Sequence, residues 1–126
     1  AKLGIGYNAR WVRPSLAAVP AARAKELLFT GRRFKAAEAH AMGLVSYVFP
    51  PDALEAAVKE LAAEIAGNAP LSVMAAKAVI DEIGRHPEHP DMARLDEAIA
   101  ACFASDDYAE GRTAFLEKRK PQFKGK

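Results

Sequence analysis

Hydrophobic residues in the second half of the chain recur at intervals of three or four positions, which is the spacing of one face of an α-helix. The clearest stripe holds Leu54, Val58, Leu61 and Ile65. The other stripes are Leu71, Met74, Ala75 and Ala78, then Met92, Leu95, Ile99, Cys102 and Phe103, and finally Tyr108, Phe115 and Leu116. The pattern predicts four helices, over residues 52–67, 70–84, 91–103 and 105–120.

Polar and proline residues at the starts of these stripes support the same helices. Asp52 opens a capping-box-like sequence, and Pro70 suits a first helical position. Asp91 can begin the third helix, and Ser105 can cap the fourth with its hydroxyl. The two aspartates after Ser105 place negative charge at the positive end of the helix dipole. Pro121 cannot continue that helix, so we expect the chain to turn out near it.

The first half of the chain predicts shorter helices, over residues 8–19, 20–30 and 36–42. Pro14 makes the first of them short or bent, because proline lacks the N–H that an interior helical position donates. Gly31 and Gly43 follow the other two, where a left-handed residue commonly ends a helix. Residues 44–49 predict one short strand. We therefore expect a mainly α chain with at most one short strand.

Positive charge gathers at the end of the chain. The net charge of the 126 residues is only +2, and it is accounted for by Lys118, Arg119, Lys120, Lys124 and Lys126. A protein that binds nucleic acid spreads basic residues along a face or stripe, so this pattern argues against nucleic acid as a partner. The pattern suits one small anionic group bound at one place.

Several classes of site are excluded by what the chain lacks. The single cysteine excludes an internal disulfide and a cysteine-based metal site, and Cys102 is predicted to be a small core residue. His40, His86 and His89 are too scattered to predict a metal site. The carboxylates fit helix caps or polar helix faces, so none is predicted to be catalytic. No apolar run is long enough to cross a membrane, and we expect a cytoplasmic protein.

Three segments of the chain resemble the crotonase family, the enoyl-CoA hydratases and isomerases. They read LLFTGRRF at 27–34 with MGLV at 42–45, NAPLSV at 68–73 with AAK at 75–77, and EGRTAFLEKRKPQF at 110–123. The three segments follow the family's order and cover essentially the whole chain. The resemblance implies the helical C-terminal portion of a crotonase fold, which is a ββα-superhelix.

The resemblance also implies different roles for two parts of the chain. Residues 1–50 would end the crotonase core, with short helices and one strand, and residues 51–126 would form a C-terminal helical region for trimerisation and for covering CoA. The family's two oxyanion-hole N–H groups and its two catalytic glutamates would all precede Ala1. We therefore expect the chain to be part of a longer protein, to be inactive alone, and to assemble as a trimer or a dimer of trimers.

Four residues match binding positions of the family. Phe115 and Lys118 match residues that approach CoA from a neighbouring subunit, the ring near the adenine and the flexible ammonium near a phosphate. The alternative is that Lys118 only stabilises the negative end of the helix dipole with its positive charge. Tyr7 and Trp11 fall where the family lines its acyl pocket, and core packing explains them equally well. No cofactor is implied beyond the CoA thioester that serves as substrate.

The function that follows is part of an acyl-CoA-processing enzyme, most similar to an enoyl-CoA hydratase/isomerase. The alternative is a stand-alone, non-catalytic helical module that oligomerises or binds acyl-CoA. Under either reading, helices with so much apolar surface should expose hydrophobic patches, which usually bind another protein surface. The particular reaction and the acyl-chain length are not indicated, because hydratases, isomerases and hydrolases of the family share these segments.

Overall fold

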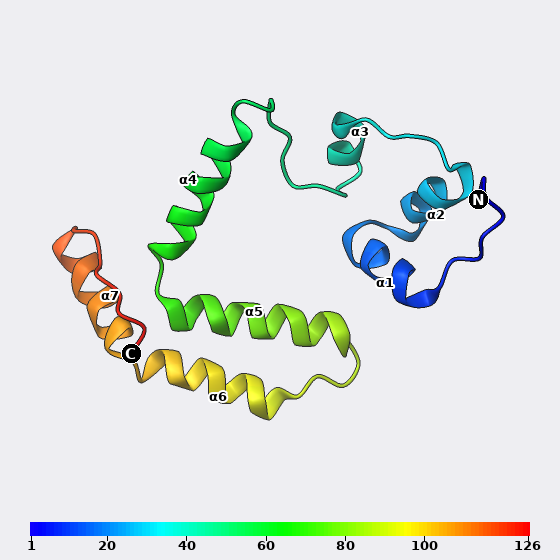
Figure 1. The fold of residues 1–126 in the computed structure, drawn as a ribbon. Helices are drawn as coiled ribbons and strands as arrows, with labels where there is room; N and C mark the ends of the chain where they lie inside the picture. Colours follow the sequence, from blue (N-terminus) through cyan, green and yellow to red (C-terminus); the bar gives the residue numbers. More distant parts are fainter. The chain divides into compact units, whose positions relative to one another are not determined.

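The computed structural model describes residues 1–126 and contains seven α-helices and no β-strand (Figure 1). The helices are α1 (Ala9–Ala18), α2 (Ala21–Thr30), α3 (Ala36–Ala41), α4 (Leu54–Ala66), α5 (Pro70–Arg85), α6 (Met92–Phe103) and α7 (Asp106–Glu117). The mainly α fold class expected from the sequence is confirmed. The chain divides into two compact units, residues 1–53 and residues 54–126.

In the first unit, α1 and α2 pack together and bury Val19 and Ala24. The side chain of Asn8 caps α1 by accepting a hydrogen bond from the backbone N–H of Arg10 at 2.8 Å. Pro14 lies inside α1, and the helix extends only four residues beyond it. The short helix expected around this proline is therefore found.

Arg32 joins α2 to α3 through two ion pairs. Its guanidinium lies 3.1 Å from the carboxylate of Glu26 on α2 and 2.7 Å from that of Glu38 on α3. The same guanidinium stacks 3.6 Å from the centre of the Phe34 ring, in a cation–π contact. These exposed contacts fix the path of the chain between the two helices.

The short strand expected at residues 44–49 is wrong. After α3 the backbone runs through bends and irregular conformations, with no ladder to another segment. A strand needs a neighbour that accepts and donates its backbone hydrogen bonds, and these residues have none. The rings of Tyr47 and Phe49 contact each other, with their centres 6.0 Å apart, and both remain exposed.

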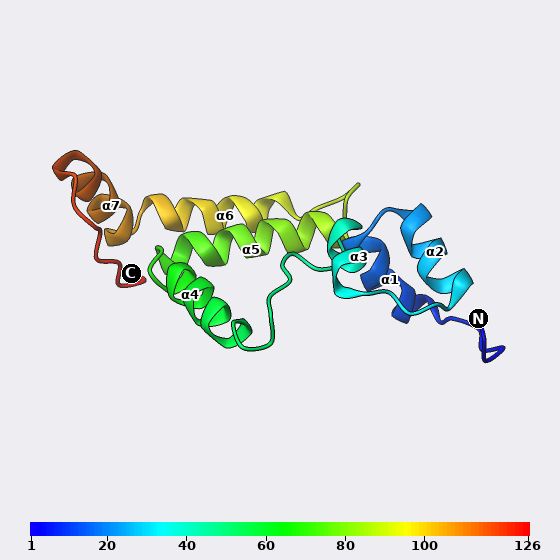
Figure 2. The ribbon, with the colours of Figure 1, turned by 90° about the horizontal axis from the view of Figure 1, so that it is seen from above.

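The second unit is built on α5 and α6, which lie side by side and antiparallel in both views (Figure 2). Leu95 on α6 is only 2% exposed and is the largest buried apolar side chain of the chain. The loop between the helices is fixed at Asp91, whose side chain caps α6 by accepting from the N–H of Arg94 at 3.1 Å. The N–H of Asp91 in turn donates to the buried carboxylate of Glu82 at 3.1 Å.

Helix α4 contributes no buried residue, although its sequence is amphipathic. The four apolar side chains of its predicted stripe are 43–55% exposed. Across the whole chain only five apolar residues are buried, and three of them are alanines. The expectation of exposed hydrophobic patches is confirmed. None of the seven helices combines the length and the apolar character that crossing a membrane requires.

Candidate functional site

Helix α7 and the residues after it carry the candidate site. Ser105 caps α7, as predicted, by accepting a hydrogen bond from the N–H of Tyr108 at 3.0 Å. Asp106 and Asp107 occupy the first turn of the helix. We call residues 119–126 the tail; it has no regular secondary structure and runs back beside α7, so that the C-terminus lies near the first turn (Figure 1).

Asp107 does more than place charge near the helix start. It is 3% exposed, and its two carboxylate oxygens accept hydrogen bonds from the backbone N–H of Lys124 at 2.6 Å and of Gly125 at 2.7 Å. Its own N–H donates to the carbonyl of Lys126 at 3.3 Å. Hydrogen bonds that involve an ionised group are shorter and stronger than neutral ones. The sequence reading missed this role and left Asp107 as a dipole charge.

Glu110, one turn later on the same helix, holds the start of the tail. Its carboxylate accepts from the N–H of Gln122 at 2.8 Å and binds the guanidinium of Arg119 through two contacts, at 2.6 and 2.9 Å. Arg119 also binds Glu117 at 2.6 Å. The hydrogen bond from Arg119, followed by that from the Gln122 N–H, lowers the pKa of Glu110 to about 2.

The arginine of the basic tail is therefore already paired. Arg119 pairs with two carboxylates of α7, and the positive charge left for an outside anion lies on the lysines. Lys120, Lys124 and Lys126 surround a polar cavity of about 470 Å³ between α7 and the tail. Asp106 and Glu110 face the same cavity, so its charge is mixed.

Lys118 sits at the end of α7 in an unusual backbone conformation. It is the only residue other than glycine with a positive φ, at 54°, and it places the C-cap in the left-handed region. Non-glycine residues pay about 1–2 kcal/mol for this conformation. The last turn is closed by hydrogen bonds from the N–H of Lys118 to Phe115 and from that of Arg119 to Ala114. The side chain of Lys118 is exposed at this corner.

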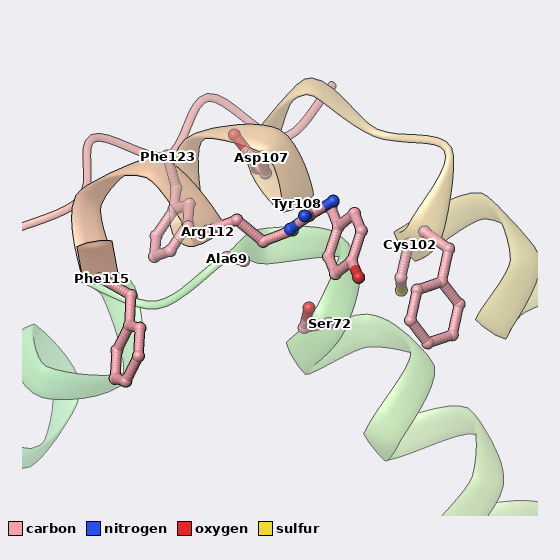
Figure 3. Close-up of a pocket in the computed structure, with 10 residues that line it drawn as sticks. Ala69, Ser72, Cys102, Asp107, Tyr108, Arg112, Phe115 and Phe123 are labelled. Carbon is pink, nitrogen blue, oxygen red and sulfur yellow. The ribbon is translucent and has the colours of Figure 1, made fainter. Parts of the chain in front are cut away.

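An apolar cavity of about 430 Å³ lies on the other side of α7 (Figure 3). We call it the aromatic pocket; it is lined by Ala69, Ser72, Cys102, Phe103, Asp107, Tyr108, Gly111, Arg112, Phe115 and Phe123. The rings of Phe103 and Tyr108 meet edge to face, 5.2 Å apart. The guanidinium of Arg112 lies 5.7 Å from the centre of the Tyr108 ring.

Three residues of this pocket differ in how far they are covered. Phe123 comes from the tail and reaches Gly111, where an added Cβ would lie 3.6 Å from the ring, an ordinary van der Waals distance. Phe115 is 83% exposed, so most of its ring remains uncovered. Cys102 is half-buried at the pocket wall, and its thiol donates to the carbonyl of Ala98 at 3.3 Å.

The predicted binding residues are split between the two units. Phe115 and Lys118 lie within four positions of each other at the end of α7. Tyr7 and Trp11 belong to the first unit: Tyr7 hydrogen-bonds the carbonyl of Leu28, and Trp11 on α1 is 68% exposed. No group of three or more histidine, cysteine, aspartate or glutamate side chains lies close enough together to hold a metal ion.

The arrangement of these helices is that of crotonase-fold proteins. A solved enoyl-CoA hydratase/carnithine racemase from Magnetospirillum magneticum superposes with a TM-score of 0.89 and 35% identity, over 99% of this chain and 46% of that chain. A solved enoyl-CoA hydratase/isomerase family protein from Hyphomonas neptunium gives a TM-score of 0.83 and 39% identity, over 99% and 47%.

The sequence comparison agrees with the fold. The family model of the enoyl-CoA hydratases/isomerases matches residues 1–126, so the chain belongs to the enoyl-CoA hydratase/isomerase family. A curated relative, the short-chain-enoyl-CoA hydratase of Clostridium acetobutylicum, is 39% identical over 97 residues. That match covers 77% of this chain and 37% of the relative. The chain thus spans less than half the length of each of these three proteins.

Proposed function

We propose that this chain is the CoA-covering part of an enzyme that processes acyl-CoA thioesters through enolate chemistry. The observation that carries the proposal is the family match along residues 1–126, combined with an exposed phenylalanine and lysine at the end of α7. The relative from Clostridium acetobutylicum is named a short-chain-enoyl-CoA hydratase, which favours hydration or isomerisation of an enoyl thioester. The CoA thioester is the substrate, and no separate cofactor is proposed.

Phe115 and Lys118 are the proposed CoA contacts. An exposed phenylalanine ring offers a flat apolar face on which an adenine can stack. Lysine carries a compact charge on a flexible stem, which suits a mobile phosphate. Lys118 lies one position beyond α7, so its charge is presented at a fixed corner of the backbone. Both residues are proposed to act on the CoA of a neighbouring subunit in a trimer or a dimer of trimers.

Tyr7 and Trp11 are proposed to line the acyl pocket. Trp11 keeps most of its ring uncovered on α1, so packing within this unit does not account for it. The hydroxyl of Tyr7 hydrogen-bonds the carbonyl of Leu28 at 3.4 Å, which ties the residues before α1 to α2. An acyl chain that covers these rings would gain apolar burial that the unit itself does not provide.

Chemistry is proposed to come from groups outside residues 1–126. The carboxylates of the candidate site already have structural partners: Asp107 and Glu110 bind the tail, and Glu117 binds Arg119. Neither a paired acid and base nor an oxyanion hole is assembled by these residues. We therefore propose that this chain alone is inactive and that it completes the substrate site.

The test is the affinity for CoA, measured by calorimetry, of variants at the end of α7. Phe115→Ala and Lys118→Gln should each weaken binding by about tenfold, which corresponds to about 1.4 kcal/mol. Lys59→Gln is the control, because Lys59 is also an exposed lysine but lies on α4, and this variant should bind CoA normally. Unchanged affinity in both α7 variants would contradict the assignment.

A second candidate is a non-catalytic module that assembles through its helices or binds acyl-CoA. The uncovered stripe of α4 and the small buried core favour an assembly role. Turnover of an enoyl-CoA by the protein purified from its native cells would exclude this candidate. CoA binding without turnover, or a stable oligomer that binds neither CoA nor a hydrophobic dye, would favour it.

A further inference from the structure

Apart from the ion pairs of Arg119, the tail is attached to α7 through its backbone rather than through its charged side chains. Three backbone N–H groups of the tail, those of Gln122, Lys124 and Gly125, all donate to carboxylates of α7. The acceptors are Asp107 and Glu110, which are three positions apart and so lie on one side of the helix. A segment without regular structure thereby has its backbone donors satisfied at fixed points.

The attachment decides where Phe123 lies. This residue stands between the two points of attachment, after Gln122 and before Lys124, and its ring packs over Gly111. Figure 3 shows the ring as one wall of the aromatic pocket, opposite the side formed by Ser72 and Cys102. Without the two attachments the ring is no longer held over α7, and the pocket loses that wall.

We propose that Asp107 and Glu110 are positioning residues, which latch the tail on α7 so that Phe123 walls the aromatic pocket beside the CoA contacts. The inference rests on the proposed function, because Phe115 lines the same pocket. Asp107 provides the buried half of the latch and Glu110 the outer half. The lysine side chains of the tail make no part of the latch and stay available around the polar cavity.

The latch is tested by hydrogen exchange of the Lys124 and Gly125 amides in the purified protein. Asp107→Asn should exchange them at least tenfold faster, because an amide side chain is a weaker acceptor and its NH₂ group faces a donor. Asp106→Asn is the matched control: Asp106 is the preceding residue in the same first turn, but it is exposed and takes no tail N–H. Unchanged exchange in Asp107→Asn would overturn the latch.

A second pair of variants tests the latch at Glu110, which is less buried than Asp107, so that misfolding of the Asp107 variant does not decide the result. Glu110→Gln should speed exchange of the Gln122 amide, whereas Glu117→Gln should not, although both side chains bind Arg119. Unchanged amide exchange within α5 and α6 shows that the fold persists in each variant. Equal rates in Glu110→Gln and Glu117→Gln would overturn the outer half of the latch.

The positioning role is tested by kinetics of the complete enzyme with an enoyl-CoA substrate, because residues 1–126 alone are proposed to be inactive. Asp107→Asn should raise KM by about tenfold and leave kcat unchanged, since the tail touches no reacting atom in this proposal. Faster exchange with an unchanged KM would overturn the positioning role. Because exchange is measured without CoA, failure of the latch is distinguishable from failure of the proposed function, which Phe115→Ala and Lys118→Gln test separately.

Discussion

Helices α7 and α4 belong to the same unit, but α7 is bound by a segment of its own chain whereas the apolar face of α4 is left uncovered. Helix α7 is held by directional contacts from its own chain, with carboxylates that receive backbone N–H groups of the tail. Helix α4 has a better apolar stripe, and yet none of its residues is buried. The carboxylates of α7 thus find their hydrogen-bond partners within this chain. The apolar face of α4, in contrast, is left uncovered by residues 54–126, and such faces usually bind another protein surface.

The largest expected effect is the difference in the free energy of unfolding between truncating a buried leucine and truncating an exposed one. Leu95→Ala should lower the free energy of unfolding by about 2–5 kcal/mol, because it truncates the largest buried apolar side chain. Leu61→Ala removes the same atoms from the exposed stripe of α4 and should change it by no more than about 0.5 kcal/mol. Denaturant unfolding measures both, and equal losses would mean that α4 is covered in solution.

A smaller effect of opposite sign is expected at the end of α7. Gly31 ends α2 with φ of 54°, and Lys118 ends α7 with the same φ, but only glycine adopts it without strain. Lys118→Gly should therefore stabilise the protein by up to about 1 kcal/mol. The same variant should weaken CoA binding if the ammonium contacts a phosphate. A variant that is both less stable and equally strong in binding CoA would contradict both statements.

The pH dependence of the latch distinguishes α7 from an ordinary exposed helix. Glu110 has its pKa lowered from the usual 4.5 to about 2 by Arg119 and the Gln122 N–H. A lowered pKa means that this contact contributes fully above pH 4.5 and is lost as the pH falls through about 2. NMR titration of the Glu110 carboxyl carbon should find its midpoint near 2, and Arg119→Gln should move it back upward. A midpoint in the usual range would disprove the pairing.

The smallest effect is expected on the polar side of α4. Lys59 and Glu55 form an exposed ion pair at 2.6 Å, four positions apart along the helix. Glu55→Gln should lower the free energy of unfolding by only about 0.2–0.5 kcal/mol. The loss should disappear in high salt, because exposed charges are screened. A loss above about 1 kcal/mol would show that this side of α4 is also in contact with another surface.

Local signals in the sequence were enough to predict most of the helices. Ser105 and Asp91 cap α7 and α6, Pro70 begins α5, and Gly31 ends α2, each as its residue type indicates. These features act within one helical turn, so they can be read without knowing the fold. Asp52 is the exception, since α4 begins two residues later, at Leu54.

Features that depend on distant residues could not be predicted in this way. The strand expected at residues 44–49 lacks the neighbour that a strand requires. The partners of Asp107 lie 17 and 18 positions away and are backbone N–H groups, which leave no mark on the side-chain pattern. Phe123 offered no clear signal, because single apolar residues are common on protein surfaces.

Beyond Arg119, the tail is bound to α7 through its backbone N–H groups, and this limits how its sequence can change. Substitutions at Gln122 or Lys124 leave the N–H donors in place, so these side chains can change without loosening the tail from α7. Proline at either position is the exception, since it has no N–H to donate. The C-terminus thus tolerates many exchanges of its exposed side chains while its path along α7 stays the same.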